Sequence, residues 1–164
     1  AKQIESVNTI SIQDGRSFGF NTDWIGFRDS LKPLLSRGDR KALVLGTGGS
    51  SSAVCFALSK LDIEVKLVSR NPKQGQLSYP GLSEVFHDYQ IIVNTTPLGM
   101  FPRVEDMPPI PYDRLSSEQL LFDLVYNPQA TRFLEMGKAK GCRVKNGLEM
   151  LELQAEASWA IWNR

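Results

Sequence analysis

One stretch, residues 41–53, constrains the fold of this chain more than any other. A short apolar run ending at Leu45 leads into Gly46, Gly48 and Gly49, and a segment with the apolar spacing of a helix follows. This order of strand, tight turn and helix is typical of a dinucleotide-binding unit. We therefore expect a nucleotide to bind where the turn meets the helix.

Each residue of the turn has an expected part in holding that ligand. Gly46 suits a sharp turn because it has no Cβ, and Gly48 lets the backbone approach a pyrophosphate closely. The N–H groups near Gly49 and Ser50, at the start of the helix, would form an anion site. Ser51 stands where a third glycine is common, so an ordinary glycine-containing loop is the alternative; the strand before and the helix after favour nucleotide binding.

Composition excludes several classes of protein. The chain has 164 residues, of which 41% are hydrophobic and 23% charged, enough for one domain with a small appendage. A net charge of +1 gives no basic field for nucleic acid, and no apolar run approaches the roughly 18 residues of a membrane span. Cys55 and Cys142 lie far apart in apolar contexts, without metal-ligand spacing. We expect free buried thiols, no metal, and a cytoplasmic protein.

The first residues predict a hairpin. Residues 6–12 alternate with period two, Asp14 and Gly15 follow as a turn, and residues 17–20 can return as a second strand. A lone hairpin is marginal in water. Because the chain also starts at Ala1 without a leader, we expect that it was cut from something longer and that the hairpin completes a sheet whose other strands are absent.

Strands and helices alternate through the rest of the chain. Asn21 or Thr22 can cap a helix that begins at Asp23 and ends near Pro33. The expected strands after it are 41–45, 63–69, 90–94, 120–126 and 142–144, and the expected helices are 53–61, 81–88, 131–140 and 147–162. This alternation predicts an α/β protein with a Rossmann-type, doubly wound parallel sheet, preceded by the β-hairpin.

Two loops at the carboxyl ends of strands are candidates for cofactor binding. Arg70 and Lys73 follow the second strand of the sheet, where an acidic residue would favour NAD. Two cations and no carboxylate suit the 2′-phosphate of NADP instead, and a solvated basic turn is the alternative. The second loop follows the expected strand that ends at Asn94, and it carries Thr95 and Met100. These three residues lie where a cofactor would pass.

The last helix carries a glutamine beside its apolar face. The residues that we expect to share that face are Leu148, Leu151, Ala155, Trp159 and Trp162. Gln154 borders them, and its amide needs a hydrogen-bond partner. A backbone carbonyl and a substrate hydroxyl both satisfy that need.

Together these motifs resemble the shikimate dehydrogenase family over essentially the whole chain. The segments that carry the resemblance are Val7-Asn8-Thr9, Asn21-Thr22-Asp23, the Gly46-Thr47-Gly48-Gly49 turn, residues 94–100, residues 123–128, and residues 146–151 with Gln154. The resemblance implies reversible, NADP-dependent reduction of 3-dehydroshikimate to shikimate, a step of aromatic amino acid biosynthesis.

The resemblance also implies residue roles. Asn8 and Asp23 would contact substrate hydroxyls, Gln154 would hydrogen-bond the substrate, and Tyr126 would line the site. Asp23 would also pair with a catalytic lysine, which fits the need for a proton donor after hydride transfer. The residues expected around the cofactor are Gly46, Gly48, Gly49, Ser50, Arg70, Lys73, Asn94, Thr95 and Met100.

The same resemblance implies a boundary and a gap. Residues 1–22 would be the end of a substrate-binding domain, and residues 23–164 the NADP-binding domain, its last helix packing back toward the substrate site. The family's catalytic lysine lies upstream, since Lys2 comes too late, so the chain alone should bind cofactor with little or no turnover. Ser52 stands where relatives often carry an arginine near the phosphates.

Two other functions remain open from the sequence. One is an NADP-binding module without catalysis, and the other is a related quinate- or shikimate-type dehydrogenase. The expected partner of the complete protein is a small-molecule substrate, and the sequence predicts no oligomeric state.

Overall fold

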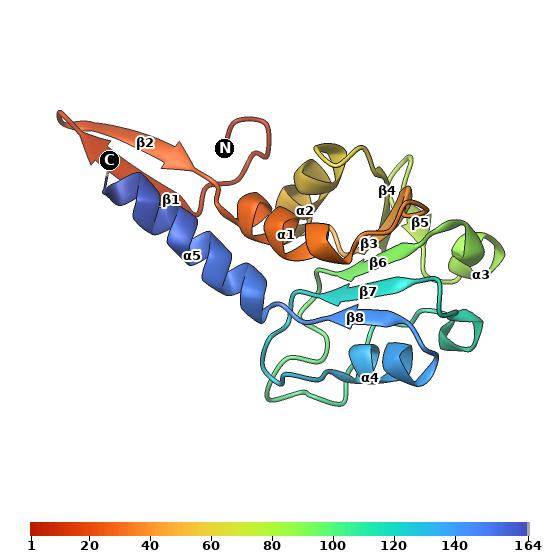
Figure 1. The fold of residues 1–164 in the computed structure, drawn as a ribbon. Coiled ribbons are helices and arrows are strands. Elements are labelled where there is room, and N and C mark those ends of the chain that lie inside the picture. The colour runs from red at the N-terminus through yellow and green to blue at the C-terminus, as the bar shows by residue number, and fades with distance from the viewer. Residues whose placement is uncertain (164) are drawn as a thin grey trace.

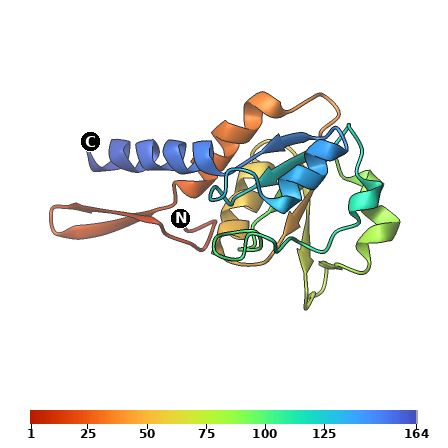
Figure 2. The ribbon, with the colours of Figure 1, turned by 90° about the horizontal axis from the view of Figure 1, so that it is seen from below.

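The computed structural model describes residues 1–163; residue 164, the last of the predicted NADP-binding domain, lies outside the described residues. An α/β body contains the central sheet, and a hairpin and the last helix extend from it side by side (Figures 1 and 2). The predicted fold class, a parallel α/β sheet preceded by a β-hairpin, is confirmed.

Six parallel strands form the sheet in the order β5-β4-β3-β6-β7-β8. Their bounds are β3 (Lys41–Leu45), β4 (Glu64–Ser69), β5 (Leu77–Ser78), β6 (Ile91–Asn94), β7 (Leu120–Asp123) and β8 (Arg143–Lys145). Chain order therefore runs outward from β3 to one edge and then from β6 to the other. In such sheets ligands bind beyond the carboxyl ends of the strands at the point of reversal, here between β3 and β6.

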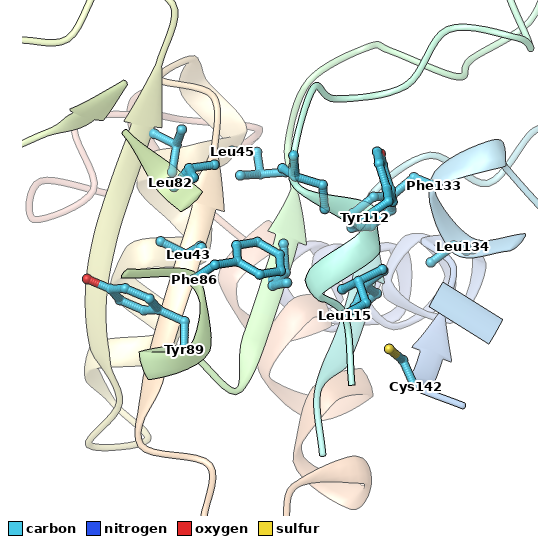
Figure 3. Packing of buried hydrophobic residues seen from close by; sticks show 14 residues of the cluster. Leu43, Leu45, Leu82, Phe86, Tyr89, Tyr112, Leu115, Phe133, Leu134 and Cys142 are labelled. Carbon is cyan, nitrogen blue, oxygen red and sulfur yellow. The ribbon is translucent and has the colours of Figure 1, made fainter. Parts of the chain in front are cut away.

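Helices cover both faces of the sheet, because its strands are apolar on both (Figure 1). Ala42 and Val44 of β3 face one layer, with α1 (Asp23–Leu31) and α2 (Gly49–Ser59). Leu43 and Leu45 face the other, together with Phe86 (Figure 3). The elements of that second layer are α3 (Leu82–Val85), α4 (Arg132–Ala139) and the short 3-10 helices Phe86–Asp88 and Tyr112–Arg114.

Local signals set the ends of several helices. α1 stops at Leu31, and Pro33 lies in the 3-10 turn Lys32–Leu34 that follows, as expected for a proline near a helix end. Thr131 caps α4 by accepting a hydrogen bond from the Leu134 N–H, and Gly141 follows the helix with a φ of 78°.

The hairpin stands apart from the sheet. It consists of β1 (Thr9–Gln13) and β2 (Arg16–Phe20), joined by Asp14 and Gly15, both of which have positive φ. The last helix, α5 (Leu148–Trp162), runs beside it, and the Trp162 indole donates to the Ile10 carbonyl over 2.9 Å. The predicted hairpin is confirmed, with a strand that starts at Thr9 rather than Ser6.

The buried side of α5 differs from the face that carries its large apolar residues. Its buried residues are Met150, Ser158 and Ile161; the Met150 backbone lies against Gly26 of α1, and Ser158 contacts Thr22 just before α1. The residues expected to share one apolar face are exposed to different degrees, and Trp159 and Trp162 remain 66% and 56% exposed. The close approach of α1 and α5 instead depends on Gly26, where a Cβ would overlap the Met150 carbonyl.

One predicted strand is shorter than expected, and one strand was not predicted. β7 ends at Asp123, three residues earlier than expected, because the Asp123 carboxylate accepts the Val125 N–H over 3.0 Å and turns the chain. β5, with two residues, is too short to leave a pattern in the sequence. Both cysteines are free: Cys142 is buried, and Cys55 is half-buried with a thiol pKa that burial raises to about 11. No helix within residues 1–163 has both the length and the apolar character needed to span a membrane.

Candidate active site

A hollow of about 290 Å³ opens where α1, α5 and the segment before β1 meet the sheet. Its lining residues are Asn8, Asp23, Ser50, Leu124, Tyr126, Gly147, Met150, Leu151 and Gln154. The four residues expected to contact substrate, Asn8, Asp23, Tyr126 and Gln154, are all among them. They come from four separate segments, so only the fold brings them together.

A second hollow, of about 390 Å³, adjoins the first along Ser50, Leu124 and Tyr126. It is lined further by Thr95, Thr96, Pro97, Met100, Phe101, Val125 and Asn127. The loops after β6 and β7 supply most of this lining, at the carboxyl edge of the sheet. Ser50, Thr95 and Met100, expected near a cofactor, therefore lie here, next to the hollow with the expected substrate contacts.

The glycine turn after β3 is open. A Cβ built on Gly48 would meet no atom within 4 Å, and the nearest to one on Gly49 would be the Ser6 hydroxyl at 3.8 Å. None of the hydrogen bonds of the described residues uses the N–H groups of Gly49 or Ser50, the first two residues of α2. The turn thus presents free amides at a helix N-terminus, the arrangement that binds a phosphate group.

Gly46 has a different part in the turn. Its φ is 109°, which favours glycine, and a Cβ there would lie 2.8 Å from Thr95 Oγ1. That hydroxyl donates to the Leu45 carbonyl over 2.7 Å. Gly46 therefore lets the loop after β6 close onto the end of β3, which joins the two loops at the point of reversal.

Asn94 is fully buried, and its side chain is hydrogen-bonded to the loop that follows β6. Its amide donates to the Asp123 carboxylate over 2.9 Å and to the Leu98 carbonyl over 3.3 Å, and its oxygen accepts from Thr96. Asp123 also accepts the Thr131 hydroxyl over 2.6 Å. Burial raises the pKa of Asp123 to about 6, although these hydrogen bonds lower it. Asn94 thus shapes the loop with a side chain that has no exposed surface.

Asp23 is the first residue of α1 and is half-buried at the hollow. Burial raises the pKa of its carboxyl group above the ordinary value, and a hydrogen bond from Asn8 opposes that rise. The Asn8 amide donates to Asp23 Oδ1 over 2.8 Å. A carboxylate with a raised pKa in a hollow suits proton transfer better than an exposed one.

The sequence prediction missed the hydroxyl groups behind this hollow. Thr22 is the N-cap residue of α1, yet its side chain makes no capping bond and contacts Asn8, Gln154 and Ser158 instead. Gln154 itself donates to the Leu151 carbonyl over 3.0 Å, the backbone partner that the sequence left open. Ser158 lies one helical turn after Gln154, and that spacing is the signal that points to it.

Arg70 and Lys73 lie away from both hollows. Both are exposed and follow the end of β4, which is the neighbour in the sheet of β3, the strand that leads into the glycine turn. None of the ion pairs formed by residues 1–163 includes either of them. Arg70 lines an open groove of about 610 Å³ with Tyr79 and Pro111. A further hollow of about 310 Å³ lies between α4 and β8 and contains none of the predicted residues.

Comparison with known proteins gives a consistent answer. No family model matches the chain. The shikimate dehydrogenase (NADP(+)) of Methanococcus aeolicus is 38% identical over 177 residues, which cover 99% of this chain and 64% of that protein. The chain therefore spans just under two thirds of the length of this curated relative.

Solved structures agree with the sequence comparison. The shikimate dehydrogenase of Aquifex aeolicus superposes with a TM-score of 0.86 at 36% identity, covering 99% of this chain and 63% of that one. Shikimate 5-dehydrogenase of Thermus thermophilus, in complex with NADP(H) and shikimate, gives 0.85 at 36% identity, covering 98% and 63%. By sequence and by fold, the chain is homologous to the shikimate dehydrogenase family over 99% of its length.

Proposed function

We propose that this chain is the cofactor-binding part of an NADP-dependent oxidoreductase that interconverts 3-dehydroshikimate and shikimate. The observation that carries the proposal is the pair of adjoining hollows that share Ser50, Leu124 and Tyr126. One contains the residues expected to contact the substrate, and the other contains residues expected beside the cofactor. A hydride donor and its acceptor need such a shared boundary.

The glycine turn fits a dinucleotide. No atom lies within 4 Å of a Cβ placed at Gly48, so a pyrophosphate would find the backbone open there, and the N–H groups of Gly49 and Ser50 would donate to its oxygens. The cofactor would supply the hydride in this reaction. Thr95 and Met100 would border it on the other side, and Asn94 would act through the shape of their loop.

Arg70 and Lys73 support NADP over NAD. Both are exposed cations one strand away from the glycine turn, where the ribose of a dinucleotide would lie. Arg70 offers a planar set of donors and Lys73 a point charge to an additional phosphate group.

Asp23, Asn8 and Gln154 would hold the substrate and its proton. Reduction of a ketone leaves an oxygen that needs a proton, and the raised pKa of Asp23 suits a group that shares one. In the complete protein, Asp23 would pair with a lysine outside this chain. We therefore expect the chain alone to bind cofactor without appreciable turnover.

The test uses the product of the complete reading frame. With 3-dehydroshikimate and NADPH we expect oxidation of NADPH, followed by its absorbance, and an Asp23→Asn variant should lose roughly a hundredfold or more in kcat. Quinate with NADP tests the quinate-type alternative. NADPH binding without turnover of either substrate would favour a binding module, and the absence of NADPH binding would overturn the proposal.

A further inference from the structure

Three buried hydroxyl groups meet behind the substrate-side hollow. Thr9 of β1, Thr22 before α1 and Ser158 of α5 are 2%, 0% and 6% exposed. Ser158 Oγ lies 2.7 Å from Thr9 Oγ1 and 2.9 Å from Thr22 Oγ1. We call these three residues the hydroxyl cluster. It joins segments that lie far apart in the chain.

The hydrogen bonds of the cluster have a direction. The Ser158 hydroxyl donates to the Gln154 carbonyl over 2.9 Å, and a hydroxyl has one hydrogen to donate. Thr9 and Thr22 therefore donate to Ser158 at their shortest contacts. As a result, the Thr22 oxygen is left to accept a hydrogen bond from the other side.

Asn8 occupies that other side. Its amide nitrogen donates to Thr22 Oγ1 over 3.0 Å and to Asp23 Oδ1 over 2.8 Å, and its oxygen accepts the Thr22 N–H over 2.8 Å. Thr22 thus contacts both ends of the amide and fixes which end faces Asp23. A flipped amide would place its oxygen against the Asp23 carboxylate.

Gln154 adjoins the same cluster. Its backbone carbonyl accepts from Ser158, and its Oε1 lies 3.3 Å from Thr22 Oγ1, whose hydrogen is directed to the nearer Ser158. Three of the four residues that are expected to contact substrate, Asn8, Asp23 and Gln154, therefore contact the cluster or its Asn8 partner.

We propose that Thr22 and Ser158 are positioning residues, which hold the Asn8 amide toward Asp23 at the hollow that Gln154 also lines. The consequence for substrate binding rests on the proposed function. The orientation of the Asn8 amide toward Asp23 does not rest on that function, because it concerns the chain without ligand.

The titration of Asp23 measures that geometry directly. The Asn8 hydrogen bond lowers the pKa of Asp23, so a loosened Asn8 must raise it. In the chain with isotope-labelled carboxyl carbons, followed by NMR, we expect Thr22→Val and Ser158→Ala to raise this pKa by about half a unit. Asn8→Ala, at an exposed residue, should give the largest rise, and Thr22→Ser should restore the original value.

Ser30→Ala is the matched control. Ser30 is also buried in a helix, and its hydroxyl donates to the Phe27 carbonyl over 3.1 Å, as that of Ser158 donates to Gln154. It should leave the pKa of Asp23 unchanged. The proposal is wrong if Asn8→Ala raises the pKa while Thr22→Val and Ser158→Ala do not, or if Asn8→Ala has no effect. Should Ser158→Ala fail to fold, Thr22→Val and Thr22→Ser decide the question alone.

Kinetics of the complete enzyme give the second readout. We expect Ser158→Ala to raise the KM for the hydroxy-acid substrate about tenfold and to leave the KM for NADP unchanged. Equal effects on both constants would contradict positioning at the substrate hollow. If the enzyme turned over no such substrate, the proposed function would fail while the titration of Asp23 still tested the cluster.

Discussion

The Arg143 guanidinium holds the Asp39 carboxylate in a two-pronged ion pair, with N–O distances of 2.9 and 3.0 Å. Asp39 lies in the loop before β3 and is 5% exposed, whereas Arg143 begins β8 at an edge of the sheet. Arg143 also donates to the carbonyls of Leu34 and Glu118. Burial alone would raise the pKa of Asp39, but the Arg143 and Ser36 hydrogen bonds outweigh it and hold that pKa below its ordinary value.

Arg143→Met should therefore destabilise the chain by about 3 kcal/mol, because it leaves a buried carboxylate without its cation. The stability that Asp39 contributes is present above its ordinary pKa and is lost as the pH falls through the lowered value. Urea unfolding at neutral pH measures the loss. Arg37→Met, at an exposed arginine of the same loop, is the control, and an equal loss in both variants would contradict this account.

Gly26→Ala should separate α1 from α5. A Cβ at Gly26 would overlap the Met150 carbonyl and lie 2.9 Å from the Gln154 N–H nitrogen, so one helix must shift. We expect a loss of about 1–3 kcal/mol in the free energy of unfolding. Gly38→Ala, where a Cβ meets nothing within 4 Å, should change stability by less than about 0.5 kcal/mol. Similar unfolding curves for the two variants would contradict this prediction, since they would show that the crossing of α1 and α5 tolerates a Cβ at position 26.

This crossing marks a limit of prediction from sequence. The strands of the sheet other than β5, the glycine turn and the hairpin follow from short-range patterns, since apolar runs and residues such as Asp14 and Gly15 determine local structure. The buried face of α5 does not, because it depends on Gly26 of another helix and on the polar Ser158. The largest apolar residues of α5, Trp159 and Trp162, are exposed and do not mark this face.

The candidate site also contains some residues that the sequence predicted and others that it did not. Motif residues such as Asn8 and Asp23 were predicted, and the fold brings them to one hollow. The hydroxyl groups of Thr22 and Ser158 were missed, because a threonine at a helix start has an ordinary capping role and the only sequence signal for Ser158 is its spacing from Gln154. Their partners come from three elements, which only the tertiary structure reveals.

The Asp123 carboxyl group predicts a pH dependence of stability. Its pKa is raised by burial from 3.8 to about 6, so between these values the folded chain keeps a proton that the unfolded chain has lost. Its contribution to stability is therefore greatest below about pH 4 and falls by about 3 kcal/mol as the pH rises through 6. Urea unfolding across this range, compared with Asp123→Asn, isolates the effect. A constant difference between the two curves would contradict it.

Arg70→Ala should reduce the preference for NADP. If Arg70 contacts the 2′-phosphate, its loss should weaken NADP binding about tenfold and leave NAD binding nearly unchanged. Tryptophan fluorescence reports both titrations, because the chain has three tryptophans. Arg16→Ala, in the hairpin, is the charge-matched control. Equal affinity for the two cofactors before mutation would refute the role of Arg70.

Backbone amide NMR of the chain during titration with NADPH tests the central claim most directly, since each N–H reports its own surroundings. The account predicts that the signals of Gly48, Gly49 and Ser50 shift most, with those of Thr95 and Met100 changing at the same ligand concentrations. Shifts confined to another surface, such as the hollow between α4 and β8, or no saturable shift at all, would contradict it.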